Sequence, residues 1–208
     1  MKICIISSGR AGSTSLYNAF KEHLNGDFYV ITEPFNEDIE RVIPIERDQF
    51  NHIKKFENVL IKTLVFQTPP NVEINEYYEW LFNYFDHVIL LDRKDKKLQA
   101  ESYAYLRHTN ESDWHYKKKR YNMSKVPKQF LDEVYDGVIR LENKLNEISL
   151  KYNHKIYFYE DIFIKKDQEI IDEIFKSVQI EKKNNIIEKW IISDYMKVRV
   201  EEPRVKLI

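Results

Sequence analysis

Small and hydroxyl-bearing residues follow the first apolar run of the chain, in the order Ser7-Ser8-Gly9-Arg10-Ala11-Gly12-Ser13-Thr14-Ser15. If a strand ends at Ser7 and a helix begins near Ser13, this loop lies at a helix N-terminus, where backbone N–H groups and the helix dipole favour an anion. Gly9 and Gly12 would let the backbone approach a ligand closely. The hydroxyls would supply further donors, and Arg10 would add positive charge and a planar donor fork. The loop therefore predicts a phosphate-binding site.

The spacing of this loop differs from that of a Walker A motif. A Walker A loop has two glycines flanking four residues, followed by Lys and Ser or Thr. Here Ser13 follows Gly12 directly, residues 7–15 contain no lysine, and no acidic residue is obviously placed to hold magnesium. A kinase of the P-loop type is therefore weakened as an interpretation. A plain turn of small residues between a strand and a helix is the other alternative.

The remaining elements can be read from hydrophobic periodicity. Short apolar runs predict strands at 2–7, 28–32, 59–66, 87–91 and 155–159. Helical spacing predicts helices at 13–24, 74–85, 96–106, 127–152, 168–177 and 184–190, and a further one near 48–56. Strands that alternate with helices predict an α/β fold with a mostly parallel central sheet covered on both faces. Ligands bind at the carboxyl ends of such strands, which is where the first loop, Glu33, Lys62 and Arg93 are expected.

Two motifs together resemble those of sulfotransferases that use 3′-phosphoadenosine 5′-phosphosulfate (PAPS). The first loop is similar to the family's 5′-phosphosulfate loop, in which a basic residue, here Arg10, precedes a small residue, Gly and a run of Ser and Thr. The second motif is Leu90-Leu91-Asp92-Arg93-Lys94-Asp95-Lys96-Lys97-Leu98-Gln99-Ala100-Glu101-Ser102. It resembles the family's 3′-phosphate site, with Arg93 at a strand end and Ser102 in the next helix. PAPS is anionic at both ends of its adenosine, so the two sites would clamp both ends.

The second motif is closest in form to one branch of that family. Its pattern Arg-x-Asp…Gln-Ala-x-Ser is similar to a bacterial carbohydrate branch that contains trehalose 2-sulfotransferase, and Trp114-His115 and Tyr159-Glu160-Asp161 are weaker matches. The resemblance covers the order of elements from residue 1 to about 165. It implies a three-layer α/β/α fold like that of P-loop nucleoside triphosphate hydrolases, PAPS as donor and its bisphosphate (PAP) as product. It also implies a small-molecule or carbohydrate acceptor and no metal.

Sulfuryl transfer to a hydroxyl requires a base, and Glu33 is the first candidate. Thr32-Glu33-Pro34-Phe35 ends the second predicted strand, and Pro34 is expected to hold Glu33 in an extended conformation. Related carbohydrate enzymes place a catalytic Glu in a similar context. Cytosolic small-molecule sulfotransferases instead use a His shortly after a Lys-Thr dipeptide, whereas Leu64 follows Lys62-Thr63 here.

Three further residues complete the predicted catalytic set. Arg10 would stabilise the leaving phosphate, as the loop's basic residue does in the family. Lys62 could contact the acceptor or the sulfuryl group, and the alternative is an ordinary strand-end lysine. His115 could bind the acceptor or act as a different base, and the alternative is a loop histidine without such a role. The histidines show no metal-ligand spacing.

Length and charge set the remaining expectations. The chain has 208 residues, enough for one domain over 1–208, with a lid at 107–125 and a tail at 191–208. Aromatics between Tyr103 and Tyr121 could stack on a sugar, and a basic run at 117–120 or Lys197 and Arg199 could meet the nucleotide.

With 33 Lys+Arg against 34 Asp+Glu, nucleic-acid binding is not expected. No apolar run is long enough to span a membrane, and a strand beginning at Lys2 leaves no room for a signal peptide, so a cytoplasmic location is expected.

Two other classes of function remain open from the sequence. One is the P-loop kinase, for which a comparison of ATP with PAPS would discriminate. The other is a non-catalytic nucleotide-binding module, which would bind adenosine 3′,5′-bisphosphate but would lose nothing when Glu33 is replaced.

Overall fold

The computed structural model of the chain describes residues 1–24, 28–34, 52–69, 72–109 and 123–192. Its strands are β1 (Lys2–Ser7), β2 (Tyr29–Thr32), β3 (Val59–Leu64), β4 (His87–Asp92) and β5 (Ile156–Phe158). Its helices are α1 (Ser13–His23), α3 (Ile74–Tyr84), α4 (Lys96–Thr109), α5 (Lys128–Tyr152), α6 (Gln168–Ser177) and α7 (Asn184–Ile187). Three short helical turns complete them: η2 (Met123–Lys125), η3 (Glu160–Ile164) and η4 (Glu188–Ile192).

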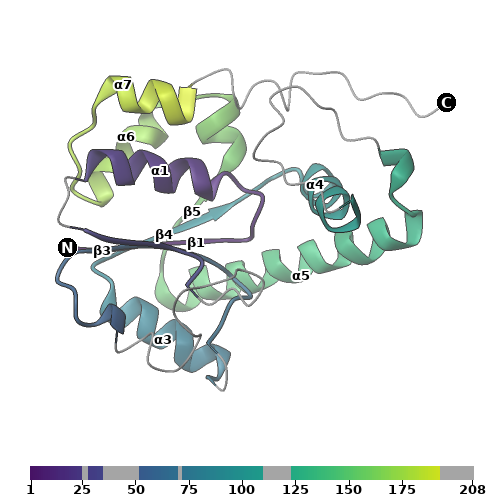
Figure 1. Cartoon of the computed structure of the whole chain (residues 1–208), viewed down its shortest axis with the longest axis horizontal. Helices are drawn as coiled ribbons and strands as arrows, with labels where there is room; N and C mark the ends of the chain where they lie inside the picture. The colour runs from purple at the N-terminus through teal and green to yellow at the C-terminus, as the bar shows by residue number, and fades with distance from the viewer. Residues whose placement is uncertain (25–27, 35–51, 70–71, 110–122, 193–208) are drawn as a thin grey trace.

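The described strands form one parallel sheet with β1 at its centre. The order is β2-β3-β1-β4-β5, and every neighbouring pair is parallel. Helices cover both faces: α1, α6 and α7 lie on one, and α3 and α5 lie on the other (Figure 1). The predicted α/β class with a mostly parallel sheet is confirmed.

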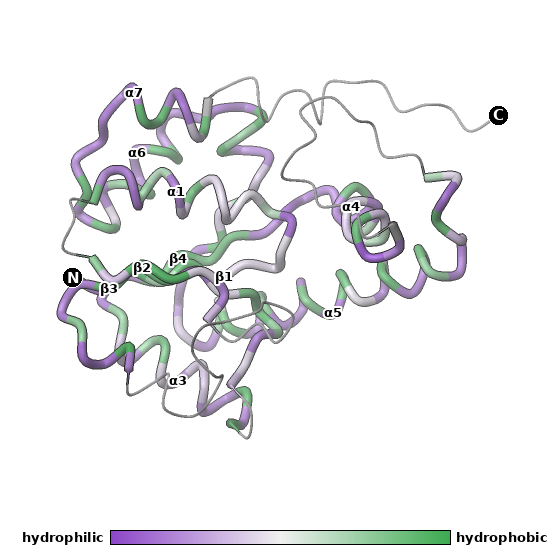
Figure 2. The backbone as a smooth tube through the Cα atoms, viewed as in Figure 1, coloured by the Kyte–Doolittle hydropathy of each residue, from purple (hydrophilic) through white to green (hydrophobic). Residues whose placement is uncertain are grey.

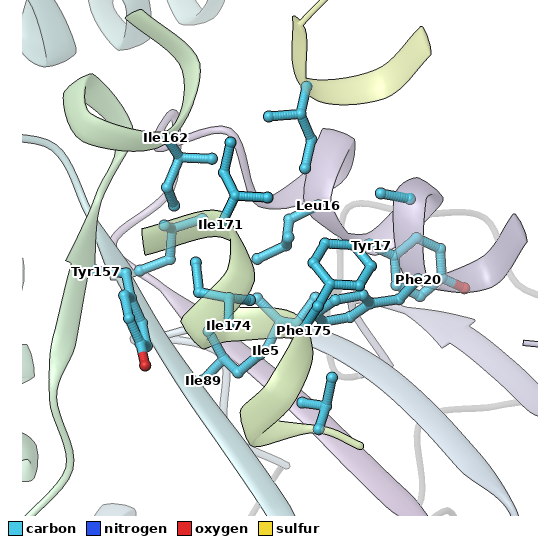
Figure 3. Close-up of a cluster of buried hydrophobic side chains, with 14 of the residues drawn as sticks. Ile5, Leu16, Tyr17, Phe20, Ile89, Tyr157, Ile162, Ile171, Ile174 and Phe175 are labelled. Atoms are coloured by element: carbon cyan, nitrogen blue, oxygen red, sulfur yellow. The ribbon is translucent and has the colours of Figure 1, made fainter. Parts of the chain in front are cut away.

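Alternation along the strands places one hydrophobic cluster on each face of the sheet. Ile3 and Ile5 of β1 point to the face that α1 and α6 cover, where they meet Leu16, Phe20 and Phe175 (Figure 3). The phenyl rings of Phe20 and Phe175 lie edge to face, with centroids 5.1 Å apart. Side chains of successive strand residues point to opposite faces. The central strands β1, β3 and β4 are largely buried on both sides, and Figure 2 shows the hydrophobic strands between the two layers of helices.

The second cluster lies beneath the other face of the sheet. Cys4 and Ile6 of β1 point there and pack with Tyr77 and Leu81 of α3 and with Leu145 of α5. Cys4 is a buried core residue, and burial raises the pKa of its thiol well above the usual value. Helix α5 is polar on its outer side, and no described helix is both long and apolar enough to cross a membrane.

Some boundaries differ from the predicted ones. Strand β3 ends at Leu64 instead of residue 66, because the chain turns there and Phe66 is 45% exposed. Helix α4 runs on to Thr109, and Arg107 and His108 in its last turn suit the negative end of the helix dipole. The predicted lid at 107–125 therefore begins with helix, and it ends in the turn η2. Residues 110–122 between them, residues 48–51 of the helix predicted near 48–56, and the tail from 193 lie outside the described residues.

Gly12 joins the first loop to α1 and is required there on two grounds. Its φ of +79° lies in the left-handed region that L side chains rarely adopt. A Cβ at this position would lie 2.4 Å from Cε2 of Phe163 and 2.9 Å from Cδ2 of Tyr159. The helix can therefore enter the core beside these two rings only because residue 12 has no side chain.

We expect Gly12→Ala to lower the free energy of unfolding by about 2 kcal/mol or more, because backbone strain adds to overpacking against two buried rings. Urea denaturation followed by circular dichroism measures this. Gly137→Ala is the matched control: Gly137 lies within α5, the nearest atom to an added Cβ is 3.8 Å away, and alanine should stabilise the helix by about 0.5–1 kcal/mol. Equal midpoints for the two variants would contradict this account of Gly12.

Candidate functional site

The register of the sheet brings the ends of neighbouring strands to one edge. Ser7, the last residue of β1, pairs with Leu64 of β3 on one side and Leu91 of β4 on the other. Thr32, the last residue of β2, lies beside Lys62. The first loop and the segments that follow β2 and β4 therefore emerge side by side, as the alternation of elements predicted.

The backbone of the first loop is in the left-handed region at three positions. Gly9 and Arg10 have φ values of 78° and 51°, and Gly12 has 79°. Gly12 is the N-cap of α1, and no side chain caps this helix end. The Ser13 hydroxyl is instead bonded to the hydroxyl of Ser7 at 3.0 Å. The Ser15 N–H is bonded to the Gly12 carbonyl at 3.0 Å, so an anion at this helix end would meet the N–H groups of the residues before it.

Two side chains of α4 hold the outer part of this loop. Gln99 donates from Nε2 to Ser8 Oγ at 2.8 Å and to the Gly9 carbonyl at 2.7 Å. The Tyr103 hydroxyl donates to the Ser8 carbonyl at 3.3 Å, and a Cβ on Gly9 would lie 1.7 Å from that hydroxyl. Burial raises the pKa of Tyr103 to about 12, so the phenol keeps its proton and remains a donor at neutral pH. Neither residue was assigned this role from sequence, although Gln99 belongs to the second motif.

Asp92 connects the first loop to the end of β4. Its Oδ1 accepts from Ser8 Oγ at 2.5 Å and from the backbone N–H of Arg93 at 2.8 Å. Its Oδ2 accepts from Lys96 Nζ at 2.6 Å, and Lys96 in turn lies 3.4 Å from a carboxylate oxygen of Glu142 on α5. Asp92 and Lys96 are both buried. One buried ion pair therefore sets the position of the first loop relative to β4.

Arg10 and Ser102 meet directly, although 92 positions separate them. Arg10 Nε donates to Ser102 Oγ at 2.9 Å across the space between the first loop and α4. Ser102 is buried, so its hydroxyl is held in one place. The basic residue of the first motif and the serine of the second therefore belong to one site.

Arg93 is held from two sides at the end of β4. Its guanidinium carbon lies 4.8 Å from the ring centroid of Tyr159, and its Nε lies 3.7 Å from Glu160 Oε1. The side chain is only 11% exposed, yet Nε makes no hydrogen bond to any described group. A buried guanidinium nitrogen without a hydrogen bond is costly in a protein interior. An anion that contacts Arg93 would remove that cost.

The acidic pair that follows Tyr159 positions the chain around Arg93. Glu160 accepts the backbone N–H groups of Lys94 and Asp95 at 2.8 and 3.0 Å. Asp161 pairs with Lys94 and Lys165. Burial raises the pKa of Asp161, but hydrogen bonds from these two lysines outweigh it and lower the pKa below its usual value. Both carboxylates therefore fix the segment after β4.

Glu33 and Lys62 form a second, partly buried ion pair at the same edge. Lys62 Nζ donates to Glu33 Oε1 at 2.6 Å and to Thr14 Oγ1 of the first loop at 3.1 Å. Lys62 points to the α1 side because Leu60, two residues earlier, does so too. Gln67, which was not predicted as a site residue, donates from Nε2 to Glu33 Oε2 at 3.1 Å. Lys62 thus connects the first loop to Glu33 through these two hydrogen bonds.

The expected extended conformation of Glu33 is wrong. Its φ of 49° lies in the left-handed region, while its backbone N–H donates to the Lys62 carbonyl at 2.5 Å. A residue of this type in that region costs about 1–3 kcal/mol and persists only where its surroundings hold it. Here the surroundings are the ion pair with Lys62 and the amide of Gln67, which turn the carboxylate back toward β3.

Several predicted contacts fall outside the described residues. They are His115 with Trp114, the basic run at 117–120, Lys197 and Arg199. Of the predicted loop residues, Ala11 is fully buried and Ser15 is buried in the first turn of α1. No three His, Cys, Asp or Glu side chains come together as metal ligands would within the described residues.

We expect Asp92→Asn to lower the free energy of unfolding by about 3 kcal/mol, because the buried Lys96 ammonium loses its nearer carboxylate and keeps only Glu142, at 3.4 Å, as an anionic partner. Chemical denaturation at neutral pH measures this loss. The double variant Asp92→Asn with Lys96→Met should recover most of the stability, since the buried ammonium that lost its nearer partner is gone. If the double variant is as unstable as the single one, the loss comes from the Ser8 contact instead of from charge.

Comparison with known proteins yields one informative similarity. No protein-family model matches the chain, and no curated protein matches it by sequence. Among solved structures the chain resembles the crystal structure of mouse sulfotransferase SULT7A1 complexed with PAP. The similarity has a TM-score of 0.50 at 13% identity and covers 98% of this chain and 68% of the mouse chain. At that identity it shows the fold alone: the chain has the P-loop-like α/β/α fold of a sulfotransferase.

Proposed function

We propose that this protein is a PAPS-dependent sulfotransferase that transfers a sulfuryl group to a hydroxyl of a carbohydrate or another small acceptor. The observation that carries the proposal is the two-ended cationic site. Arg10 and the N-terminus of α1 stand at one end, and Arg93, whose buried Nε makes no hydrogen bond to a described group, stands at the other. Ser102 bonds to Arg10 between them. The protein with the similar fold was crystallised with PAP, a nucleotide that is anionic at two positions.

The residues present fit the donor chemically. The first turn of α1 lacks a side-chain cap and would hold the 5′-phosphate group. Arg93 and Ser102 would hold the 3′-phosphate, because a guanidinium and a hydroxyl supply the charge and donors that phosphate oxygens accept. A kinase would need a lysine within the loop, and the loop contains none.

The proposed reaction is an in-line displacement at sulfur. The acceptor oxygen forms a new S–O bond while the S–O bond to the 5′-phosphate breaks, and the phosphate leaves with the bonding electron pair. Arg10 stabilises the charge that develops on the leaving phosphate. Glu33 takes the proton of the acceptor hydroxyl. Positioning and electrostatics dominate, as in phosphoryl transfer.

Lys62 stabilises the negative charge of the sulfuryl group more strongly as the reaction advances. In the resting site its ammonium is paired with Glu33, and it also contacts Thr14 on the donor side. Once Glu33 has accepted a proton, the ammonium loses its anionic partner and its charge is directed toward the sulfuryl oxygens. Stabilisation that strengthens along the reaction path lowers the barrier more than uniform binding does.

Three features support a carbohydrate as acceptor. The second motif resembles the branch that contains trehalose 2-sulfotransferase, and the candidate base is a carboxylate where cytosolic small-molecule enzymes have a histidine. In addition Phe66, next to Gln67 in the turn after β3, is 45% exposed. An exposed ring one residue from a partner of Glu33 could stack on the apolar face of a sugar.

Nucleotide binding tests the donor site. We expect PAP to raise the melting temperature of the protein and ATP to do so much less. Arg93→Ala should weaken PAP binding by about tenfold or more, since each charged hydrogen bond contributes about 1.5–3 kcal/mol. Isothermal titration calorimetry measures the affinity, and Arg140→Ala, an exposed arginine of α5, is the control that should bind normally. Stabilisation by ATP equal to that by PAP would favour a kinase, and no response to PAP would overturn the proposal.

Turnover tests the base. Glu33→Gln should reduce kcat by about 100-fold or more, because general-base catalysis contributes about 10²–10⁴, while its affinity for PAP stays within about twofold. The assay follows transfer of radiolabelled sulfate from PAPS to a panel of sugars and phenols. Glu79→Gln, an exposed carboxylate of α3 that pairs with Lys151, is the matched control. Full activity of Glu33→Gln would show that another residue is the base, and His115 would be the next to test. Faster reaction with phenols than with sugars would contradict the proposal that the acceptor is a carbohydrate.

A further inference from the structure

Gln67 closes the turn after β3 with its side chain as well as its backbone. Its backbone N–H donates to the Leu64 carbonyl at 2.9 Å, and the Leu64 N–H donates back to Gln67 Oε1 at 3.1 Å. The residue is 5% exposed. Because Oε1 accepts the Leu64 N–H, the orientation of the amide group is determined, and Nε2 must be the atom that faces Glu33.

Each oxygen of the Glu33 carboxylate accepts a hydrogen bond from β3 or from the turn that follows it. Lys62 of β3 donates to Oε1 at 2.6 Å, and Gln67 donates to Oε2 at 3.1 Å. The backbone N–H of Glu33 is also bonded to β3, through the Lys62 carbonyl. The position of this carboxylate therefore depends on the neighbouring strand more than on its own, which fits the left-handed backbone at residue 33.

We propose that Gln67 is the positioning residue for Glu33: its amide N–H holds the carboxylate in one orientation beside Lys62 and favours its anionic, proton-accepting form. The inference rests on the proposed function, since it assigns a role within the same site. A hydrogen bond donated to a carboxylate stabilises the charged form. An amide does this without adding a second positive charge, so the charge of Lys62 remains the larger influence on the pair.

The structure suggests a substitution that separates this role from closure of the turn. Gln67→Glu keeps an oxygen for the Leu64 N–H but replaces the donor to Glu33 with a second carboxylate oxygen. Two adjacent carboxylates disfavour ionisation of each other. Gln67→Leu removes the donor without adding charge, but it also leaves the Leu64 N–H without its partner.

The experiment measures the titration of Glu33 directly in the full chain. Carbon-13 NMR of protein labelled at the glutamate carboxyl carbons gives the signal, which is assigned by its loss in Glu33→Gln. We expect the titration of Glu33 to move to higher pH in Gln67→Glu and, by a smaller amount, in Gln67→Leu. The acidic limb of the kcat–pH profile should move in the same direction, and kcat at neutral pH should fall by about tenfold or more.

The chain offers a matched control for the pair. Gln129 of α5 donates from Nε2 to Glu133 Oε1 at 3.1 Å, the same distance as in the Gln67–Glu33 pair, but it lies on the exposed surface. Gln129→Leu should leave both the titration of Glu33 and the pH profile unchanged. Circular dichroism and the melting temperature show whether each variant is folded.

The outcomes separate this inference from the proposed function. If the titration of Glu33 in a folded Gln67→Glu variant coincides with that of the wild type, Gln67 does not position Glu33, whatever the activity. If the titration moves but the wild-type protein neither binds PAP nor transfers sulfate, the proposed function is overturned, and with it the catalytic meaning of the Gln67 contact. A shift in titration together with the shifted acidic limb supports both.

Discussion

The buried carboxylate of Asp92 is the group on which the arrangement of this edge depends. It is the last residue of β4 and accepts hydrogen bonds from Ser8 in the first loop, from the backbone N–H of Arg93 and from Lys96 in α4. Because β1 and β4 are adjacent and parallel, the first loop and the end of β4 would lie near each other in any case. The hydrogen bonds of Asp92 hold the first loop and the segment after β4 at a fixed distance from each other. The two halves of the proposed nucleotide site are therefore parts of one hydrogen-bonded unit.

Local patterns were enough to predict the layers of the fold and the edge at which the candidate site lies. The strands are short apolar runs, of which β1, β3 and β4 are largely buried, and a helix of amphipathic spacing follows most of them. For a parallel sheet this order leaves few topologies, and all of them bring the carboxyl ends of the strands to one side. The contact between Arg10 and Ser102 agrees with the pairing of two motifs that are far apart in sequence.

Contacts that join side chains from different segments were not predictable in the same way. Gln99 and Tyr103 reach the first loop because only three residues separate the end of β4 from the start of α4, so that the helix runs close to Gly9. Gln67 follows a strand that was predicted to extend to residue 66, and the turn that brings its amide to Glu33 begins at Leu64. Glu33 itself was expected to be extended because a proline follows it. Tertiary contacts overrode that local preference, as they do where a side chain is held by several partners.

The ion pair of Lys62 and Glu33 shows why those unpredicted contacts matter. Lys62 is 5% exposed and Glu33 is 17% exposed, so each charge depends on the other for compensation. Such a pair would be positioned poorly if only one bond joined it, because a glutamate side chain has several rotatable bonds. The second bond, from Gln67, and the contact of Lys62 with Thr14 fix the pair at both ends. The carboxylate and the ammonium are thereby held beside the first loop, which is the arrangement that a base and a cation at a transferring anionic group require.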